Sequence, residues 1–383
     1  MVSALSVLIP LRTNDFAFYR ARLALRAALN LDGVETIIVD DGSPQSVAAE
    51  ISDFCTALDF QYLRLETGNQ PFSLARSRNA GLRAASSPSV YMDDADLIYR
   101  CDFFQAVVEQ MNGLAQTPFN FLSAPAVYLT AGASEKVFAD GCLDESYLQV
   151  VHALLLEDPK GSPTNTVVDS YAPASGVIVL NRELALRIGG YDESFSGWGG
   201  EDRDFIFRLL CVNEKIGLPA RFNETKSWNL NDTLAFEGWR ALHRLHGEFM
   251  ARQGLYAVHL HHYKLPWRES ASTSRNMRLA ADKAMAVQVA DLPATRRIEL
   301  QQSVLFDCYR AYGLMDATVS SDVLVEQLRA ARRTKERAQG VARPWYRKLR
   351  KLFVSPMAFL RDSRHGTLRG LARVVDQVMK VFG

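Results

Sequence analysis

The sequence of 383 residues predicts an α/β protein built on a doubly wound, mixed sheet. Short apolar runs rich in β-branched residues alternate with helical segments through the first hundred residues, as in a mainly parallel sheet covered on both faces. Acidic clusters directly follow two of these runs, and ligands of such sheets bind at the carboxyl ends of the strands. The same pattern therefore predicts the fold and the edge of the sheet that carries a site.

The predicted elements follow one another in a regular order. Five apolar segments have the length and residue types of strands, namely 4–10, 35–39, 60–65, 90–92 and 174–182. Helical periodicity is present in 15–31, 45–58, 73–84, 183–188, 205–210, 237–253, 277–289 and 298–312. A last strand-like run with alternating histidines covers 254–262, and residues 119–169 show no clear pattern.

The composition is that of an ordinary globular protein, with 48% hydrophobic and 23% charged residues. The formal net charge is +1, yet the segment from Arg329 to the end holds 15 Lys and Arg against 3 Asp and Glu. A basic tail on an acidic body indicates an anionic partner, either a membrane surface or nucleic acid.

The five cysteines are scattered without a Cys-x-x-Cys pair, which predicts reduced thiols and a cytoplasmic location. No apolar run is long enough for a membrane-spanning helix.

Two acidic clusters mark the first candidate site. Asp40 and Asp41 follow the second predicted strand and precede a Gly-Ser pair, so a simple turn also explains them. Asp93, Asp94 and Asp96 follow the fourth strand. A turn explains this second cluster less well, because neighbouring carboxylates repel one another unless a cation compensates them. Two carboxylates one residue apart can hold a hard divalent ion that also binds a diphosphate.

A tryptophan among three glycines marks the second candidate site. Glycines beside Trp198 allow positive φ and a close approach of a ligand to the backbone. Glu201 and Asp202 follow at a predicted helix start, where the helix dipole favours their ionised form. An exposed Trp offers an apolar face of the kind that stacks on sugar rings. Acidic first-turn residues also cap helices, but a cap needs no preceding glycine-tryptophan segment.

This second site carries a resemblance to a known family. Gly189-Gly190-Tyr191-Asp192-Glu193, followed by Trp198-Gly199-Gly200-Glu201-Asp202, resembles the acceptor-side motif of galactosyltransferase-type enzymes with the GT-A fold. The resemblance implies that Asp202 is the catalytic base. It also implies that the acceptor sugar is bound by Trp198, Gly199, Gly200 and Glu201.

The first hundred residues resemble the nucleotide-binding half of family 2 glycosyltransferases. The segments that carry this resemblance, in the family's order, are Pro10, Val39–Ser43, Ala75–Gly81 and the Asp-x-Asp after the fourth strand. The residues it implies for the nucleotide sugar are Pro10, Asp40, Asp41, Arg78, Asp93 and Asp94. Asp41, or Asp40 in its place, would contact the base, and Arg78 would lie near the nucleotide.

The resemblance also implies a bound Mn²⁺ or Mg²⁺. Asp93-Asp94 and Asp94-x-Asp96 compete for the metal-side motif, and we favour Asp94 and Asp96 because apolar Leu97-Ile98 follows. A histidine beyond the Glu-Asp helix would complete the site as a neutral imidazole. His259 and His261 share a face of the predicted strand by period-2 alternation, and we choose His259. His243 and His246, on the preceding helix, are expected to be ordinary surface residues.

The predicted function is that of an inverting, metal-dependent glycosyltransferase. It would move a galactose- or N-acetylhexosamine-type sugar from a UDP-sugar to a hydroxyl of a glycan or lipid-linked glycan, in bacterial surface polysaccharide synthesis. A non-catalytic glycan- or sugar-nucleotide-binding protein is the first alternative, disfavoured because both acidic motifs are present. A nucleotidyltransferase, the second, would carry a glycine-rich, lysine-containing loop after the first strand. No nucleic-acid partner is expected.

Three parts are expected along the chain. Residues 1–263 would form the GT-A domain, with the nucleotide-binding half in 1–110 and the acceptor half in 111–263. A helical C-terminal extension would follow, comprising an accessory region in 264–330 and a basic amphipathic tail in 331–383. The tail would attach the protein to the anionic inner face of the cell membrane. Its docking on the body or on another subunit is the alternative.

Overall fold

A computed structural model of the chain describes residues 3–144, 146, 148–151, 166–226, 237–262, 270–289 and 292. All of them lie in the first of two compact units, Met1–Ala317. The predicted helix 298–312 and the basic tail lie outside the described residues.

The larger sheet has six strands in the order β3-β2-β1-β4-β9-β6. Their bounds are β1 (Leu5–Leu11), β2 (Val34–Asp40), β3 (Gln61–Arg64), β4 (Ser89–Met92), β6 (Phe121–Ser123) and β9 (Ile178–Asn181). Strands β3, β2, β1 and β4 run parallel, whereas β9 runs antiparallel to both β4 and β6. The predicted mixed α/β sheet is therefore confirmed, and the parallel part is the one that the β-branched runs indicated.

A second, smaller sheet has the strand order β5-β10-β7-β8. Its strands are β5 (Leu97–Ile98), β7 (Ala126–Leu129), β8 (Val168–Ala172) and β10 (Ala257–His259). Strand β10 pairs antiparallel with β5, so that His259 lies opposite Leu97. This pairing joins a segment near the end of the domain to the acidic cluster that follows β4.

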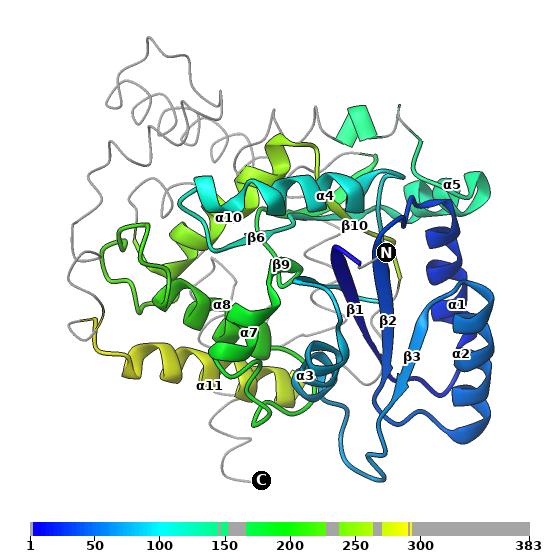
Figure 1. The fold of residues 1–383 in the computed structure, drawn as a ribbon, viewed down its shortest axis with the longest axis horizontal. Helices are drawn as coiled ribbons and strands as arrows, with labels where there is room; N and C mark the ends of the chain where they lie inside the picture. The colour runs from blue at the N-terminus through cyan, green and yellow to red at the C-terminus, as the bar shows by residue number, and fades with distance from the viewer. Residues whose placement is uncertain are drawn as a thin grey trace, which may run out of the picture. The chain divides into compact units, whose positions relative to one another are not determined.

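Helices cover the sheets on more than one side (Figure 1). They are α1 (Ala17–Ala24), α2 (Gln45–Ala57), α3 (Leu74–Ala84), α4 (Phe103–Asn112), α5 (Ala131–Asp140), α7 (Arg182–Arg187), α8 (Glu201–Cys211), α10 (Trp239–Arg252) and α11 (Ser270–Ala286), with 3₁₀ turns at Leu25–Ala28 and Leu114–Gln116. Helix α3 packs on β1 and β2, α10 packs on β6, and α11 packs on α8. The last contact brings the predicted accessory region against the helix that begins with Glu201.

Helix α3 is fixed close to the sheet by its sequence. The Ser73 hydroxyl accepts the Arg76 backbone N–H and caps the helix start. Gly81 faces the sheet, where an added Cβ would lie 3.2 Å from Val39 and 3.3 Å from Leu8. A larger residue would push the helix outward, so this glycine helps to keep α3, and the arginines it carries, against the strands.

The expectation that His243 and His246 are surface residues is wrong. Both side chains are fully buried between α10 and β6. The His246 ring stacks on Phe121 with centroids 4.2 Å apart, and His243 Nε2 lies 3.2 Å from Ser123 Oγ. Burial lowers the pKa of His246 to about 4 and that of His243 well below its usual value, so both pack as neutral aromatic rings.

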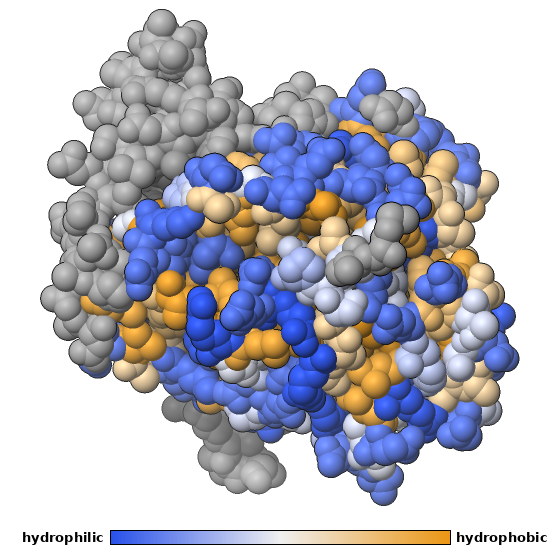
Figure 2. Space-filling model, viewed as in Figure 1, coloured by the Kyte–Doolittle hydropathy of each residue, from blue (hydrophilic) through white to orange (hydrophobic). Residues whose placement is uncertain are grey.

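The surface mixes polar and apolar residues. On the face shown in Figure 2, hydrophilic residues predominate and hydrophobic ones form separate areas. Among the described residues, no helix combines the length and the apolar character needed to cross a bilayer.

Candidate active site

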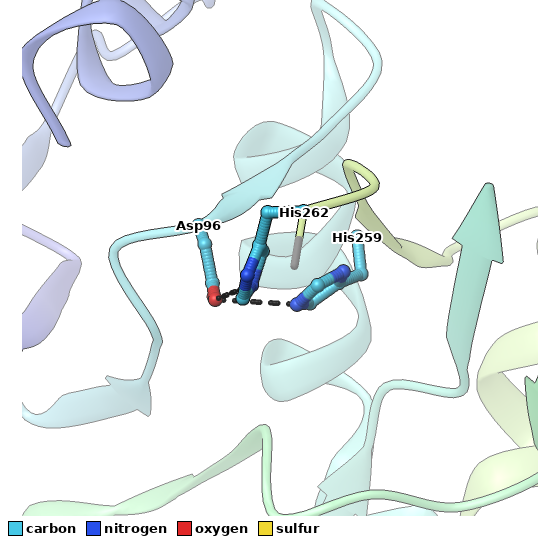
Figure 3. Close-up of side chains that lie close together, drawn as sticks. All are labelled: Asp96, His259 and His262. Carbon is cyan, nitrogen blue, oxygen red and sulfur yellow. Dashed lines mark hydrogen bonds and ion pairs between the residues drawn. The ribbon is translucent and has the colours of Figure 1, made fainter. Parts of the chain in front are cut away.

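Three side chains with metal-ligating atoms meet where β5 pairs with β10 (Figure 3). Asp96 immediately precedes β5, His259 ends β10, and His262 follows three residues later. Asp96 Oδ2 lies 3.2 Å from Nε2 of each histidine. One ligand atom from each of the three residues lies within 4.8 Å of the others.

The electrostatics of this cluster suit a cation. Burial opposes ionisation of Asp96, but hydrogen bonds from His259 and His262 outweigh it and hold the pKa of the carboxyl well below its usual range. An ionised carboxylate and two imidazoles match a divalent first-row transition metal. They suit Mn²⁺ better than Mg²⁺, which prefers oxygen ligands.

The structure differs from the predicted ligand set at two positions. It places Asp94 outside the cluster, with Oδ1 3.1 Å from Arg78 Nη2. The alternation that paired His259 with His261 applies only within a strand, and β10 ends at His259. His261 donates its backbone N–H to Ser134 Oγ, and His262 takes the place beside Asp96. The three-residue spacing of His259 and His262 was the signal in the sequence that could have identified the pair.

An open hollow adjoins the cluster and unites predicted residues from both halves. Its lining residues are Pro10, Leu11, Arg12, Tyr19, Phe72, Leu74, Asp94, Ala95, Asp96 and Trp198. Pro10 and Asp94 are contributed from the carboxyl ends of β1 and β4, as the doubly wound pattern predicts. Trp198 is contributed from the loop before α8, more than 100 residues away. The sequence did not indicate Arg12 as a site residue. Its positive charge in the lining, together with the carboxylates of Asp94 and Asp96, suits an anionic ligand.

Arg78 connects the two acidic clusters. Its guanidinium is 3% exposed and donates to Asp94 Oδ1 at 3.1 Å and to Glu201 Oε1 at 3.0 Å. It also lies over the ring of Tyr191, with Cζ 5.2 Å from the centroid. Arg78, which was predicted near the nucleotide, thus also contacts Glu201 of the predicted acceptor-side motif.

Glu201 and Asp202 begin α8 but differ in environment. Glu201 is 4% exposed, and its Oε2 has no hydrogen-bond partner among the described residues. Burial and the nearby Asp202 charge raise the pKa of Glu201 to about 7, although Arg78 acts in the opposite direction. Asp202 is half-buried, and its Oδ1 accepts the Arg203 backbone N–H at 2.8 Å. Its carboxylate packs on Gly176, where an added Cβ would lie 2.9 Å from Oδ2.

Asp40 and Asp41, predicted at the nucleotide base, are fully buried and already paired. Asp41 accepts bonds from Arg76 Nε and Nη2 at 2.8 and 2.7 Å and from the Ser73 backbone N–H. Asp40 accepts bonds from Tyr62 Oη and from the Ser43 backbone N–H. Neither residue lines the hollow, so contact with a base would require these bonds to open.

Asp93 requires a correction, because its carboxylate faces the interior. It forms an ion pair with buried Arg26 at 2.7 Å and accepts a hydrogen bond from Tyr99. Half-buried Arg76 and buried Arg26 pair with Asp41 and Asp93 from distant positions in the chain, which the local acidic pattern could not reveal.

The two glycines that were predicted to bind the acceptor pack against the protein itself. Gly199 and Gly200 have φ of +86° and +93° and pack against α11. Their close approach is to a helix of the protein, which the sequence pattern did not indicate.

Comparisons with known proteins agree with this architecture. A family model described as "Glycosyltransferase like family 2" matches residues 6–286. Chondroitin synthase of Escherichia coli is 24% identical over 256 residues, which are 61% of this chain and 36% of that protein. Validoxylamine A glucosyltransferase of Streptomyces hygroscopicus subsp. limoneus is 27% identical over 253 residues, 61% of this chain and 55% of that protein. The chain thus spans little more than half of these relatives at most.

The solved structures to which the chain is similar include a mannosyltransferase and a glucosyl-3-phosphoglycerate synthase. A mannosyltransferase from Pyrobaculum calidifontis, in complex with GDP-Man and Mn²⁺, is 15% identical with a TM-score of 0.35 and 82% of both chains covered. A glucosyl-3-phosphoglycerate synthase from Mycobacterium tuberculosis, in complex with Mn²⁺, UDP-glucose and phosphoglyceric acid, is 15% identical. Its TM-score is 0.41, with 75% of this chain and 81% of that chain covered. With scores below 0.5, neither likeness bears on the site.

The family match extends over the hollow, the Asp96 cluster and the start of α8. It continues through 286, where α11 ends. The chain therefore belongs to the glycosyltransferase-like family 2, and its mixed sheet is of the GT-A type.

Proposed function

We propose that this chain is an inverting, metal-dependent glycosyltransferase with a UDP-sugar donor. The transferred sugar is of the galactose or N-acetylhexosamine type, and the acceptor is a hydroxyl of a glycan. One observation carries the proposal: Asp94, Asp96 and Trp198 line one hollow, and Arg78 links Asp94 to the Glu201-Asp202 motif. A donor-side carboxylate cluster and an acceptor-side base are needed together for direct transfer.

The donor side is suited to a diphosphate. Asp96, His259 and His262 would hold the divalent ion, which supplies positive charge against the departing diphosphate. Arg12 lines the same hollow, and its Nη1 donates to the Gln70 carbonyl at 2.7 Å. Arg12 thus contributes a positive charge to the lining of the hollow, from just beyond the end of β1. Asp94 is the more exposed carboxylate there, and it would contact sugar or ribose hydroxyls.

The acceptor side supplies the base. Trp198 offers a face on which the acceptor ring stacks. Asp202 takes the proton of the acceptor hydroxyl as that oxygen attacks the anomeric carbon. The new C–O bond forms on the face opposite the departing diphosphate, so configuration inverts without a covalent sugar–enzyme intermediate. We assign the base to Asp202 rather than Glu201 because Glu201 is buried and held by Arg78.

The proposed biological context rests on the name of one relative and on the charge of the C-terminal segment. The name of the E. coli relative, a chondroitin synthase, supports a glycan acceptor and bacterial surface polysaccharide synthesis. The basic tail supports a peripheral position at the cytoplasmic face of the membrane, where a lipid-linked glycan would be accessible.

The test is a screen of nucleotide sugars for hydrolysis by the full chain without acceptor. Each donor is incubated with Mn²⁺, with Mg²⁺ and with EDTA, and the released UDP is measured. We expect UDP from one or a few UDP-sugars, only with a metal. Binding without turnover would favour a non-catalytic protein. Release of pyrophosphate from UTP and a sugar 1-phosphate, assayed in parallel, would favour a nucleotidyltransferase. Full turnover in EDTA would contradict metal dependence.

A further inference from the structure

Helix α11 holds the loop that carries Trp198. Asn276 is fully buried, and its Nδ2 donates to the carbonyl of Ser196 at 2.9 Å and to that of Trp198 at 3.4 Å. Arg275 Nη2 donates to the same Ser196 carbonyl at 3.3 Å. One side-chain amide thus fixes the backbone on both sides of Gly197.

The glycines of the loop fit closely against this helix. Gly197, Gly199 and Gly200 have φ between +81° and +93°. An added Cβ would lie 3.3 Å from Ser272 at Gly197, 2.8 Å from Met277 Cε at Gly199, and 2.6 Å from the Asn276 carbonyl oxygen at Gly200. Any Cβ at Gly200 would collide with backbone, so this segment lies directly on α11.

The C-terminal end of α11 is attached to the start of the same region. Lys283 forms an ion pair with Asp192, which precedes the loop. Burial opposes ionisation of Asp192, but the hydrogen bond from Lys283 lowers the pKa of its carboxyl to about 2. The helix therefore contacts the region at Asp192, at Ser196 and at Gly200, along most of the segment that leads to Glu201.

We propose that α11 is the element that positions the acceptor, and that Asn276 is the positioning residue for Trp198. The inference rests on the proposed function, because it assigns Trp198 to an acceptor sugar. Asn276 does not line the hollow, so it acts only through the loop backbone. Its loss should change acceptor binding while leaving the donor side, formed by Asp96 and the histidines, intact.

The first test follows Trp198 by ¹⁹F NMR in the full chain labelled with 5-fluorotryptophan. The Trp198→Phe variant assigns the resonance. We expect one narrow Trp198 line in the wild type and in Asp282→Ala, a change at an exposed residue of the same helix. Asn276→Ala and the near-isosteric Asn276→Asp, which lacks the amide donor, should shift or broaden it. Asn276→Gln should restore part of the wild-type line.

The second test separates acceptor from donor. With p-nitrophenyl hexosides as acceptor probes, we expect Asn276→Ala to raise the acceptor KM about tenfold, the size expected for losing one buried hydrogen bond. UDP release without acceptor should be unchanged. Lys283→Met, at the other end of α11, should act in the same direction and serves if Asn276→Ala does not fold.

The outcomes separate the two proposals. An unmoved Trp198 line in both Asn276→Ala and Asn276→Asp would overturn the positioning role, whatever the enzyme's activity. Equal loss of UDP release and transfer in those variants would also overturn it, because it would indicate general disruption. Absence of UDP release in the wild type would instead count against the proposed function, and the NMR comparison would still decide the role of Asn276.

Discussion

Three aspartates of the candidate site, Asp93, Asp96 and Asp202, have different environments. Asp93 is neutralised by buried Arg26, whereas Asp96 accepts bonds from two imidazoles. Asp202 is half-buried at the start of α8, beside buried Glu201. These environments place Asp93 in the interior, and they support the proposed roles of Asp96 at a cation and of Asp202 in proton transfer.

Replacing Asp202 tests the base directly. Asp202→Asn should lower turnover by two to four orders of magnitude, the usual contribution of a general base, with donor affinity unchanged. Glu201→Gln is the matched variant, and it should mainly raise the acceptor KM. Steady-state kinetics and calorimetry with UDP distinguish the two effects. Near-normal turnover of Asp202→Asn, with a larger loss in Glu201→Gln, would move the base to Glu201.

Single substitutions distinguish the proposed metal ligands from their neighbours. Asp96→Ala should abolish the gain in UDP affinity that Mn²⁺ produces, measured by calorimetry, because it removes the charged ligand of the cluster. His259→Ala and His262→Ala should raise the metal concentration needed for half-maximal activity. His261→Ala is the control, since its backbone, rather than its ring, bonds to Ser134. An effect at His261 with none at His262 would show that the ligand set is misassigned.

The raised pKa of Glu201 predicts a pH-dependent stability. Its pKa in the folded protein is about 7, above the ordinary 4.5, so folding favours the protonated form. Its contribution to the free energy of unfolding is therefore complete below about pH 4.5 and is lost as the pH rises through about 7. Thermal unfolding of the wild type and Glu201→Gln should diverge across this range, with the variant gaining relative stability at higher pH. A constant difference in Tm would contradict the shift.

At the scale of elements, sequence periodicity predicted what local packing controls. Strands β1 and β2 were recognisable because each is a long, buried, β-branched run. Helix α3 was recognisable because its own sequence supplies the capping residue. Strand β5 has two residues and exists only because β10 pairs with it, so no local pattern could indicate it. The predicted strand in 254–262 was too long, because β10 ends at His259. Strand alternation was therefore applied beyond the strand, and it favoured His261 over His262.

Contacts between distant parts of the chain limited how much of the candidate site could be predicted from the sequence. Asp94 and Asp96, predicted at the metal, and Trp198, predicted at the acceptor, line one hollow. Their motifs were recognisable in the sequence because strand ends and glycine loops have positional meaning. The link from Arg78 to Glu201 joins residues 123 positions apart and has no local signature. The same holds for the contact of Asn276 with the loop.

Glycine substitutions test how closely the loop lies on α11. Gly189 and Gly200 both have positive φ, +85° and +93°, but a Cβ at Gly189 meets nothing within 4 Å. Gly189→Ala should cost only the backbone term of about 1–2 kcal/mol. Gly200→Ala adds a collision with the Asn276 carbonyl and should cost clearly more. Urea unfolding measures both, and equal costs would mean that the loop can move away from the helix.

At the scale of the whole molecule, the site depends on two sheets. The six-stranded sheet presents Pro10 and Asp94 at its carboxyl edge, while the four-stranded sheet brings His259 to Asp96. The loop that carries Trp198, which lies on α11, would add the proposed acceptor side. Contacts between segments far apart in the chain therefore assemble the site, and it should be lost together with the fold on unfolding.

The distribution of charge over the whole chain leads to the last prediction. The 15 basic and 3 acidic residues from Arg329 onward contrast with an acidic body. The run Arg343-Pro344-Trp345-Tyr346-Arg347 adds aromatic residues that prefer a membrane interface. Beyond Pro356, apolar residues recur at three- and four-residue spacing, as in an amphipathic helix that lies on a bilayer surface.

Flotation with liposomes tests this attachment. Each basic residue near an anionic surface contributes about 1 kcal/mol, so a handful in contact would hold the protein there. The full chain should float with anionic vesicles at low salt, and less so with neutral vesicles or at high salt. A chain ending at Gln339 should remain at the bottom of the gradient. Equal flotation of both chains, or of neither, would favour docking of the tail on the protein itself or on a second subunit.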